Sequence, residues 1–309
     1  MVARVSTAYF PADLPTLVTI RKVAVIGAGT MGSGIAQVCA QTGWEPRLFD
    51  AFPESLERGI ERIQEFWDRG ISKGKTTSQQ KEKWTSNLIA TSEMSEAVEG
   101  SEIVIEAVPE KMELKKSIFE ELGVMAPSNA VLATNTSGLP ISEIASHTSC
   151  PERVIGMHFF NPVPLMKLLE IVRHESVDES TVSVAKEVGE AMGKTTILVN
   201  DVPGFATSRL GVDQGNEAIR MLAEGVATAS DIDTAMRLGY RHPMGPLELS
   251  DLDGLDVRMD ILNSLAEAFQ DDAYRPHPLL KSLVESGDLG KKSGRGIYDW
   301  TSGEKSERV

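Results

Sequence analysis

Residues 22–32 have the sequence KVAVIGAGTMG, a short apolar run followed by three glycines spaced as G-x-G-x-x-G. Residues 22–26 have the length and composition of a buried strand, and the pattern of residues 31–42 predicts a helix that ends at Gly43. Residues 46–49 predict a second strand. This order of strand, glycine turn, helix and strand is typical of a parallel βαβ unit.

The three glycines of this turn each have a steric role in a dinucleotide site. Gly27 allows a tight turn out of the strand, Gly29 lets the main chain approach a pyrophosphate, and Gly32 brings the helix close to the sheet. The N–H groups at the start of the helix, at Thr30 and Met31, would then bind the phosphates. Glycine-rich turns alone are common, but this one follows a strand and opens a helix, so it predicts a dinucleotide site.

An acidic residue follows at the distance that such a site requires. Asp50 ends the second predicted strand, 23 residues after Gly27. Its carboxylate can hydrogen-bond a ribose 2′-hydroxyl and would repel a 2′-phosphate, so the pattern favours NAD over NADP. Two alternatives stay open here. One is an FAD site, which usually comes with further motifs that this sequence does not contain, and the other is a doubly wound fold that has lost its nucleotide.

The rest of the chain divides into a strand-rich part and a helical part. Five more strands are predicted at residues 103–108, 131–134, 153–157, 167–172 and 195–199. From Asp201 onward the pattern is helical, and Ser230 as N-cap with Asp233 three residues later predicts the start of one helix. We therefore expect an α/β fold: a Rossmann-like doubly wound sheet in residues 21–200, followed by a smaller all-α domain in residues 201–309.

The composition narrows the class of protein. With 309 residues, 41% of them hydrophobic, the chain is long enough for about two folded domains. Its 31 basic and 45 acidic side chains give a net charge of −14, which argues against a general nucleic-acid binder. No apolar run reaches the roughly 18 residues of a transmembrane helix. Residues 1–20 lack the apolar core of a secretory signal, so a short extension is expected. Two cysteines, Cys39 and Cys150, make no disulfide framework and fit a reducing, cytoplasmic location.

One of the five histidines has both a position and a partner suited to catalysis. His158 follows the predicted strand 153–157, and strand C-termini line the ligand crevice of open α/β sheets. Glu170 lies in an apolar strand where a carboxylate needs a partner, and a turn at residues 162–164 could bring the two together. A neutral imidazole would accept a hydroxyl proton as a hydride leaves the same carbon, while the carboxylate holds the ring. The alternative is a core histidine in a structural ion pair.

The region from residue 54 to residue 83 is expected to be helical and has a local excess of basic side chains. Four apolar residues fall on one helical face: Leu56, Ile60, Ile63 and Trp67. Three arginines cluster on the opposite face: Arg58, Arg62 and Arg69. The simpler interpretation is a solvated face with Glu54–Arg58 and Glu65–Arg69 ion pairs. The alternative is a docking face for a phosphate-bearing substrate, to which Lys73 and Lys75 would add.

Seven motifs along the chain are specific enough to indicate a family. They are VAVIGAGTMGSGIAQVCAQTG, EAVPE, NTSGLPI, HFFNPVPLMKLLEIV, DVPGFATSRL, GPLELSDLDGLD and GKKSGRGIYDW. On these motifs the chain resembles the L-3-hydroxyacyl-CoA dehydrogenase family, of the 3-hydroxybutyryl-CoA dehydrogenase type, from Val23 to Trp300. The resemblance implies reversible oxidation of an (S)-3-hydroxyacyl-CoA to the 3-oxoacyl-CoA, with hydride transfer to NAD.

The resemblance also implies roles for residues of the substrate site. His158 and Glu170 would form the catalytic dyad. Ser137 would hydrogen-bond the substrate oxygen on C3, and Asn161 would contact the substrate or the nicotinamide. One position departs from the family pattern G-F-x-x-N-R, because Ser208 stands where many members have an asparagine that helps to polarise the substrate oxygen. A hydroxyl can donate one hydrogen bond but is shorter than an amide.

For the cofactor, the resemblance places Glu110 and Lys115 near the nicotinamide half of NAD and brings Lys292 to it from the C-terminal tail. The CoA-binding serine and lysine of the family do not align cleanly with residues 55–75. CoA contacts there are therefore expected only of basic side chains: Arg58, Arg62, Arg69 and Lys73. A homodimer through the helical domain is implied as well, and no metal, nucleic-acid or membrane partner is expected.

Two alternative functions remain open. One keeps the fold and changes the substrate to a free 3-hydroxy acid or a carnitine-like compound, although such relatives tend to lack the sequence HFFNPVPLMKLLEIV. The other is a non-catalytic NAD(H)-binding or structural protein. The His158–Glu170 pair argues against it, because a structural role does not require that dyad.

Overall fold

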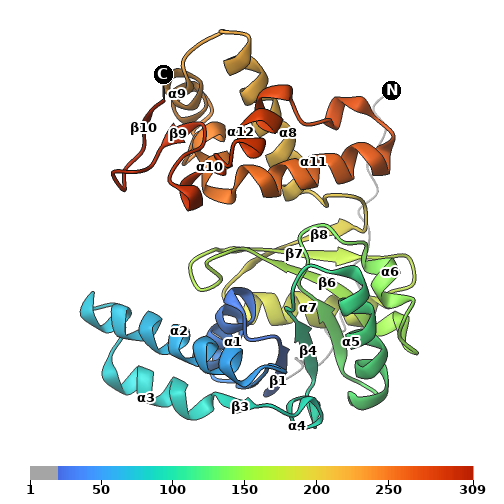
Figure 1. The fold of residues 1–309 in the computed structure, drawn as a ribbon. Coiled ribbons are helices and arrows are strands. Elements are labelled where there is room, and N and C mark those ends of the chain that lie inside the picture. The colour runs from blue at the N-terminus through green and yellow to red at the C-terminus, as the bar shows by residue number, and fades with distance from the viewer. Residues whose placement is uncertain (1–19, 309) are drawn as a thin grey trace, which may run out of the picture.

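The computed structural model describes residues 20–308, which form an α/β domain and a helical domain (Figure 1). The α/β domain is built on one sheet of eight strands in the order β3-β2-β1-β4-β5-β6-β7-β8. Their bounds are β1 Lys22–Ile26, β2 Glu45–Phe49, β3 Ile89–Thr91, β4 Ile103–Glu106, β5 Val131–Thr134, β6 Val154–Phe159, β7 Leu168–Arg173 and β8 Thr195–Asn200.

All neighbouring strands in this sheet are parallel except β6 and β7, which are antiparallel. The predicted Rossmann-like doubly wound sheet is therefore confirmed. The short edge strand β3 is one that the sequence pattern does not predict. Of the expected N-terminal extension, only Ile20 lies among the described residues.

Helices cover both faces of the sheet. They are α1 Thr30–Thr42, α2 Pro53–Ser72, α3 Ser78–Asn87, α4 Met94–Val98, α5 Met112–Met125, α6 Ile141–Ala145 and α7 Glu179–Ala191. Val23 and Val25 of β1 pack on the side of α1, α2 and α7, whereas Ala24 and Ile26 pack on the side of α4, α5 and α6. Because both faces are buried, β1 is apolar at nearly every position instead of alternating with polar residues.

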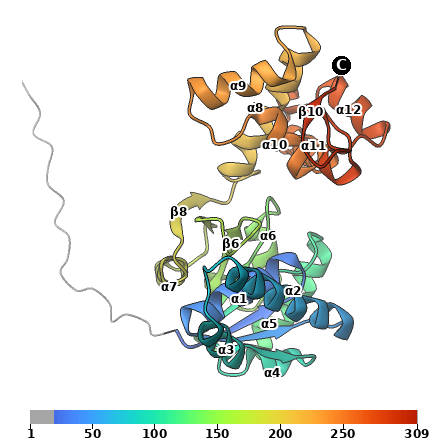
Figure 2. The same cartoon turned by 90° about the vertical axis from the view of Figure 1, so that its left-hand side faces the viewer.

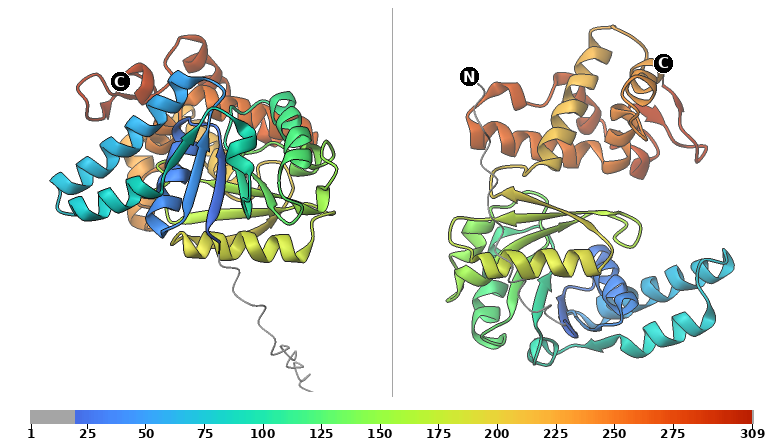
Figure 3. Two further views of the ribbon diagram at one scale, coloured as in Figure 1. Left: turned by 90° about the horizontal axis from the view of Figure 1, so that it is seen from below. Right: turned by 180° about the vertical axis from the view of Figure 1, so that it is seen from behind.

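α2 and α3 form a helical hairpin that projects from the α/β domain (Figure 3). The region 54–83 is thus divided into two helices, and α3 begins with a capping box between Thr77 and Gln80. α2 passes close to the glycine turn, since a Cβ on Gly59 would lie 2.7 Å from the carbonyl oxygen of Ala28. The N-terminal half of α2 therefore lies beside the predicted pyrophosphate site.

After β8 the chain crosses into the helical domain, a connection visible in Figure 2. This domain has α8 Thr207–Ala223, α9 Ala229–Gly239, α10 Pro246–Asp253, α11 Leu255–Phe269, α12 Pro278–Glu285 and the short strands β9 Tyr298–Asp299 and β10 Ser306–Glu307. It buries an apolar core of its own around Leu247, Leu255 and Leu262. None of the described helices is both long and apolar enough to cross a bilayer.

The start of α9 differs from the expectation. Thr228 is its N-cap and accepts a hydrogen bond from the N–H of Asp231, so the prediction of Ser230 as N-cap is wrong. Asp233 is buried and accepts hydrogen bonds from the N–H groups of Leu247 and Glu248 at the start of α10. Tertiary packing therefore uses Asp233 to cap a neighbouring helix.

Candidate active site

The glycine turn between β1 and α1 leaves room at one glycine and none at the other two. A Cβ on Gly27, whose φ is +101°, would lie 2.8 Å from the carbonyl oxygen of Ala107. A Cβ on Gly32 would lie 1.7 Å from the carbonyl oxygen of Gly27. Gly29 has nothing within 4 Å of the corresponding position. Open space therefore lies in front of the first turn of α1, as a bound pyrophosphate would need.

The groups around this space suit an NAD molecule. The N–H groups of Thr30 and Met31, in the first turn of α1, have no acceptor inside the helix. The Asp50 carboxylate at the end of β2 accepts hydrogen bonds from the N–H groups of Ala28, at 2.8 Å, and Phe52, at 3.0 Å. These bonds fix the carboxylate beside the turn, and each oxygen keeps a lone pair for a ribose hydroxyl.

The basic face of α2 is divided between two environments. Arg62 is partly buried and turns back over the glycine turn, where its Nη1 donates to the Ser33 hydroxyl oxygen at 3.1 Å. Arg58 and Arg69 are exposed, as is Lys73 just after the helix. The expectation that the three arginines share one solvated face is therefore wrong for Arg62.

One of the two expected ion pairs on α2 is present. Arg58 Nη1 lies 3.9 Å from an oxygen of Glu54. Arg69, in contrast, donates from Nε to the main-chain carbonyl oxygen of Glu65 at 3.3 Å, so the predicted pairing of those two side chains is wrong. The Arg69 guanidinium has no neutralising carboxylate from Glu65.

His158 and Glu170 meet across the antiparallel β6–β7 pair. They are register partners, and His158 Nδ1 lies 2.6 Å from Glu170 Oε2. The two side chains are only 6% and 0% exposed. The rings of Phe160 and Phe205 lie beside the imidazole, with centroids at 4.4 and 6.1 Å. The prediction that a turn after β6 brings Glu170 against His158 is confirmed.

Glu170 accepts four hydrogen bonds. Its Oε1 accepts from the N–H groups of Ala206, at 3.2 Å, and Thr207, at 3.0 Å. Its Oε2 accepts from the Thr207 hydroxyl at 2.6 Å as well as from His158. Burial alone would raise the pKa of the Glu170 carboxyl, but the bonds from His158 and Thr207 outweigh it and hold the pKa below its ordinary value. An ionised Glu170 in turn favours the tautomer of His158 that has its proton on Nδ1 and a lone pair on Nε2.

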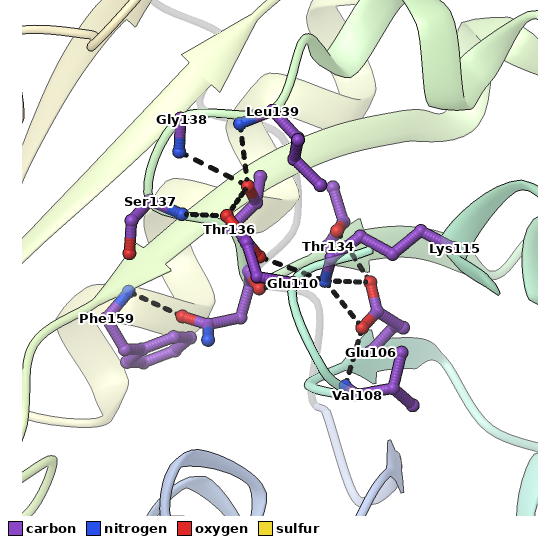
Figure 4. Close-up of polar contacts among 11 residues, drawn as sticks. Glu106, Val108, Glu110, Lys115, Thr134, Thr136, Ser137, Gly138, Leu139 and Phe159 are labelled. Carbon is purple, nitrogen blue, oxygen red and sulfur yellow. Dashed lines mark hydrogen bonds and ion pairs between the residues drawn. The ribbon is translucent and has the colours of Figure 1, made fainter. Parts of the chain in front are cut away.

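A buried ion pair fixes the ends of β4 and β5 (Figure 4). Lys115 and Glu106 have no exposed side-chain surface, and Lys115 Nζ lies 2.7 and 2.9 Å from the two Glu106 oxygens. The Thr134 hydroxyl and the Val108 N–H donate to the same carboxylate. Burial raises the pKa of the Glu106 carboxyl, and the Lys115 ammonium offsets part of this effect. Lys115 also donates to the carbonyl oxygen of Asn135 at 3.1 Å, so it holds the loop that follows β5.

Glu110 and Ser208 hold the loop of Ser137 from two sides. Glu110 Oε1 accepts hydrogen bonds from the Ser137 N–H, at 2.9 Å, and from the Thr136 hydroxyl (Figure 4). Ser208, on α8 of the helical domain, donates its hydroxyl to the carbonyl oxygen of Ser137 at 3.0 Å. Ser137 is thus exposed at a junction of both domains with its main chain fixed.

Two predicted site residues have surroundings of their own. Asn161 is exposed in the turn that follows β6, three residues after His158. Lys292 lies in the helical domain, where its Nζ is 2.6 Å from Asp256 Oδ1. Asn161 is therefore close to His158 along the chain, whereas Lys292 is paired with a carboxylate of its own domain.

Three residues of the site were not singled out from the sequence. Asn135 directly follows β5 and accepts the Phe159 N–H at 3.0 Å; its signal is a polar residue at a strand C-terminus, as for His158. Glu106 is a carboxylate in an apolar strand, the signal that pointed to Glu170. Thr207 has no such signal, because its contact with Glu170 crosses from one domain to the other.

Comparisons with known proteins match both domains of the chain. Residues 22–202 match the family model described as 3-hydroxyacyl-CoA dehydrogenase, NAD binding domain, and residues 204–300 match the C-terminal domain of the same family. The chain is 47% identical to a probable 3-hydroxybutyryl-CoA dehydrogenase of Bacillus subtilis, over 91% of this chain and 98% of that protein. It is 42% identical to a 3-hydroxybutyryl-CoA dehydrogenase of Bradyrhizobium diazoefficiens, over 91% of this chain and 96% of that protein.

A solved structure is similar as well. The crystal structure of (S)-3-hydroxybutyryl-CoA dehydrogenase from Ralstonia eutropha superposes with a TM-score of 0.88 at 37% identity, covering 91% of this chain and 99% of that one. The likeness therefore includes both domains and the connection between them.

Proposed function

The chain belongs to the 3-hydroxyacyl-CoA dehydrogenase family, and on this premise we propose that it catalyses the reversible, NAD-dependent oxidation of an (S)-3-hydroxyacyl-CoA to the 3-oxoacyl-CoA. The names of its relatives favour a short acyl chain such as 3-hydroxybutyryl. The observation that carries the proposal is the buried, hydrogen-bonded pair of His158 and Glu170 at the end of β6.

His158 acts through Nε2 in this mechanism, because Glu170 engages Nδ1. Nε2 accepts the proton of the C3 hydroxyl group, and the ionised Glu170 stabilises the imidazolium that forms. The glycine turn and Asp50 would hold NAD, which would supply the acceptor for the hydride of C3. Phe160 packs on the imidazole of His158. It limits the access of water to the proton on the imidazolium. In the reverse direction the imidazolium returns its proton to the C3 oxygen.

Ser137 is proposed to donate its hydroxyl to the substrate oxygen on C3. Its main chain is already held by Glu110 and Ser208, so the hydroxyl can be presented in a fixed place. Because Ser208 donates to the Ser137 carbonyl oxygen, we assign Ser208 to positioning Ser137 instead of polarising the substrate directly. Asn161 is proposed to contact the substrate or the nicotinamide from the turn after β6.

The remaining cofactor contacts follow the same order. Asp50 is proposed to bind the adenosine ribose, and Glu110 to approach the nicotinamide half. Lys115 Nζ lies 3.7 Å from Glu110 Oε2 with no exposed surface of its own, so we assign it to positioning Glu110. Lys292, two of whose three N–H donors bind Asp256, is proposed to approach NAD from the helical domain.

CoA is proposed to lie along the exposed part of the α2 basic face. Arg58, Arg69 and Lys73 are the exposed members of this group. Their charges could bind the phosphates of CoA in a protein whose net charge is −14. Arg62 is closer to the pyrophosphate region of NAD, since it donates to Ser33 in α1.

A second copy of this chain is proposed to cover the helical domain. Leu210, Leu238 and Tyr240 are 71%, 74% and 75% exposed, so the helical domain has apolar side chains that such an interface would bury. Light scattering of the purified protein tests for the homodimer. The two free, buried cysteines support a cytoplasmic location.

The proposal is tested by incubating the protein with NAD and (S)-3-hydroxybutyryl-CoA and following NADH absorbance. NADH formation with the thioester, but not with free 3-hydroxybutyrate or carnitine, supports an acyl-CoA dehydrogenase. Turnover of the free compounds alone would replace this function with the dehydrogenation of small hydroxy acids. Binding of NADH without turnover of any of them would indicate a non-catalytic NAD(H)-binding protein.

A further inference from the structure

Thr207 connects the helical domain to the carboxylate of the dyad. It is the first residue of α8, and it contacts Glu170 twice: its N–H donates to Oε1 at 3.0 Å and its hydroxyl donates to Oε2 at 2.6 Å. Oε2 is also the atom that His158 Nδ1 approaches to 2.6 Å. One oxygen of Glu170 is therefore shared between the imidazole of one domain and the hydroxyl of the other.

We propose that Thr207 is a positioning residue through which the helical domain sets the orientation and protonation of the His158–Glu170 dyad. The inference rests on the proposed function, in which this dyad moves the substrate proton, and adds a residue to it. Thr207 itself need not touch the substrate or NAD.

The charge of Glu170 depends on few groups. On β6 the titratable group that faces it is His158, and on β8 its register partner is the apolar Ile197. At the start of α8 the groups that face it are the N–H of Ala206, the N-cap residue, and the N–H and hydroxyl of Thr207. Arg209, two residues further on, donates from Nε to the Tyr274 hydroxyl at 2.8 Å. The Thr207 hydroxyl is thus the one side-chain donor to Glu170 from α8 among the described residues.

The sign of the expected effect follows from these contacts. Each donor to the carboxylate stabilises its charged form and lowers the pKa of Glu170, against the effect of burial. Loss of the Thr207 hydroxyl makes the carboxylate more basic, so the dyad takes up a proton at a higher pH. Oxidation of the hydroxyacyl substrate requires the neutral imidazole. The acidic limb of the pH profile of kcat/KM therefore moves to higher pH in the variant.

The loop before α8 does not depend on this hydroxyl for its shape. The Phe205 N–H donates to the carbonyl oxygen of Val202 at 2.9 Å, and the Arg209 N–H donates to that of Gly204 at 2.9 Å. A Cβ on Gly204 would lie 2.9 Å from Leu265 of α11, so the turn is packed against the helical domain. Removing one hydroxyl is therefore expected to leave the two domains in place.

The test compares Thr207→Val and Thr207→Ala, which lack the hydroxyl, with Thr207→Ser, which keeps it. Thr181→Val is the matched control. Thr181 lies in the first turn of α7, away from the dyad, and its hydroxyl donates to the main-chain carbonyl oxygen of Glu152. For each protein, kcat and KM for (S)-3-hydroxybutyryl-CoA are measured across pH. Imidazole ¹⁵N shifts of the free protein give the titration midpoint of the dyad independently of turnover.

We expect the acidic limb of kcat/KM and the ¹⁵N midpoint to move up by about one pH unit in Thr207→Val and Thr207→Ala. Thr207→Ser and Thr181→Val are expected to follow the unmodified protein, and KM for NAD to stay within about twofold in all of them. Profiles of Thr207→Val and Thr207→Ala that superpose on that of the unmodified protein would overturn the inference. If the unmodified protein does not turn over the thioester at all, the proposed function fails, and the ¹⁵N midpoints still decide the role of Thr207.

Discussion

His158 and Glu170 are register partners in the antiparallel β6–β7 pair, with Nδ1 and Oε2 2.6 Å apart. Directly opposed residues in an antiparallel pair project to the same face, so the sheet itself keeps the two side chains together. The turn between the strands has only to reverse the chain. The dyad is therefore positioned by strand pairing inside the sheet.

Replacement of either dyad member is expected to remove most of the activity. His158→Gln removes the general base, and we expect kcat to fall about 10²-fold or more. Glu170→Gln keeps the shape of the side chain without its charge and is also expected to lower kcat. The double variant should lose little more than His158→Gln, because the two residues act as a unit. Glu175→Gln, an exposed carboxylate near the end of β7, is the control. Unchanged kcat in His158→Gln would refute the assignment.

Asp50 is expected to set the cofactor preference. Its carboxylate is fixed beside the glycine turn by the N–H groups of Ala28 and Phe52, where it would repel a 2′-phosphate. We expect kcat/KM to favour NADH over NADPH by about 10²-fold or more, and Asp50→Ser to narrow that ratio. The ratio is measured from kcat/KM for the reduction of acetoacetyl-CoA with NADH and with NADPH. Comparable values for both cofactors in the unmodified protein would contradict this role.

The Lys115–Glu106 pair is expected to contribute to stability. Lys115→Met leaves a fully buried carboxylate without its ammonium partner and should lower the free energy of unfolding by about 3–5 kcal/mol. The double variant Lys115→Met/Glu106→Gln is expected to recover a large part of this loss. Lys116→Met is the matched control, since its partners Glu113 and Glu143 have 88% and 47% of their side-chain surface exposed and stay hydrated without it. The free energy of unfolding of each variant is measured by urea denaturation. Equal loss in Lys115→Met and Lys116→Met would argue against a buried, coupled pair.

The basic face of α2 is expected to act on the nucleotide part of CoA. Arg69→Ala and Lys73→Ala should each raise KM for acetoacetyl-CoA by about 3–10-fold, more at low salt than at high salt. With acetoacetyl-pantetheine, which lacks the phosphorylated adenosine, the same variants should have normal KM values. Arg237→Ala, an exposed arginine on α9, is the control. A rise in KM with both substrates would place the effect outside CoA recognition.

Much of the fold follows from local sequence patterns. The unit from β1 to β2, the strand end at Asp50 and the change to helices after β8 all come from apolar periodicity and glycine spacing. The predicted strand 153–157 ends too early, because β6 runs to Phe159 and His158 lies inside it. Strand β3 does not, because it is three residues long and two of them are exposed at the sheet edge. A strand with so little apolar surface is defined by its pairing with β2.

The misjudged side chains depend on tertiary neighbours. Helical spacing places Arg62 with Arg58 and Arg69, but the glycine turn lies against that side of α2 and attracts the Arg62 guanidinium. Ser230 and Thr228 are both suitable N-caps by composition. In the structure Thr228 takes this role by accepting the N–H of Asp231, while Asp233 accepts the N–H of Leu247 in α10. Contacts across the domain junction, such as Thr207 with Glu170, have no local pattern at all.

The account is tested most directly by comparing acetoacetyl-CoA with free acetoacetate as substrates for NADH oxidation by the unmodified protein. Contacts with the CoA part of the substrate should also stabilise the transition state, so we predict that kcat/KM is higher for the thioester by about 10²-fold or more. His158→Gln is expected to lower kcat for the thioester by about 10²-fold or more. If kcat/KM for free acetoacetate equals that for acetoacetyl-CoA, the assignment of an acyl-CoA substrate is contradicted.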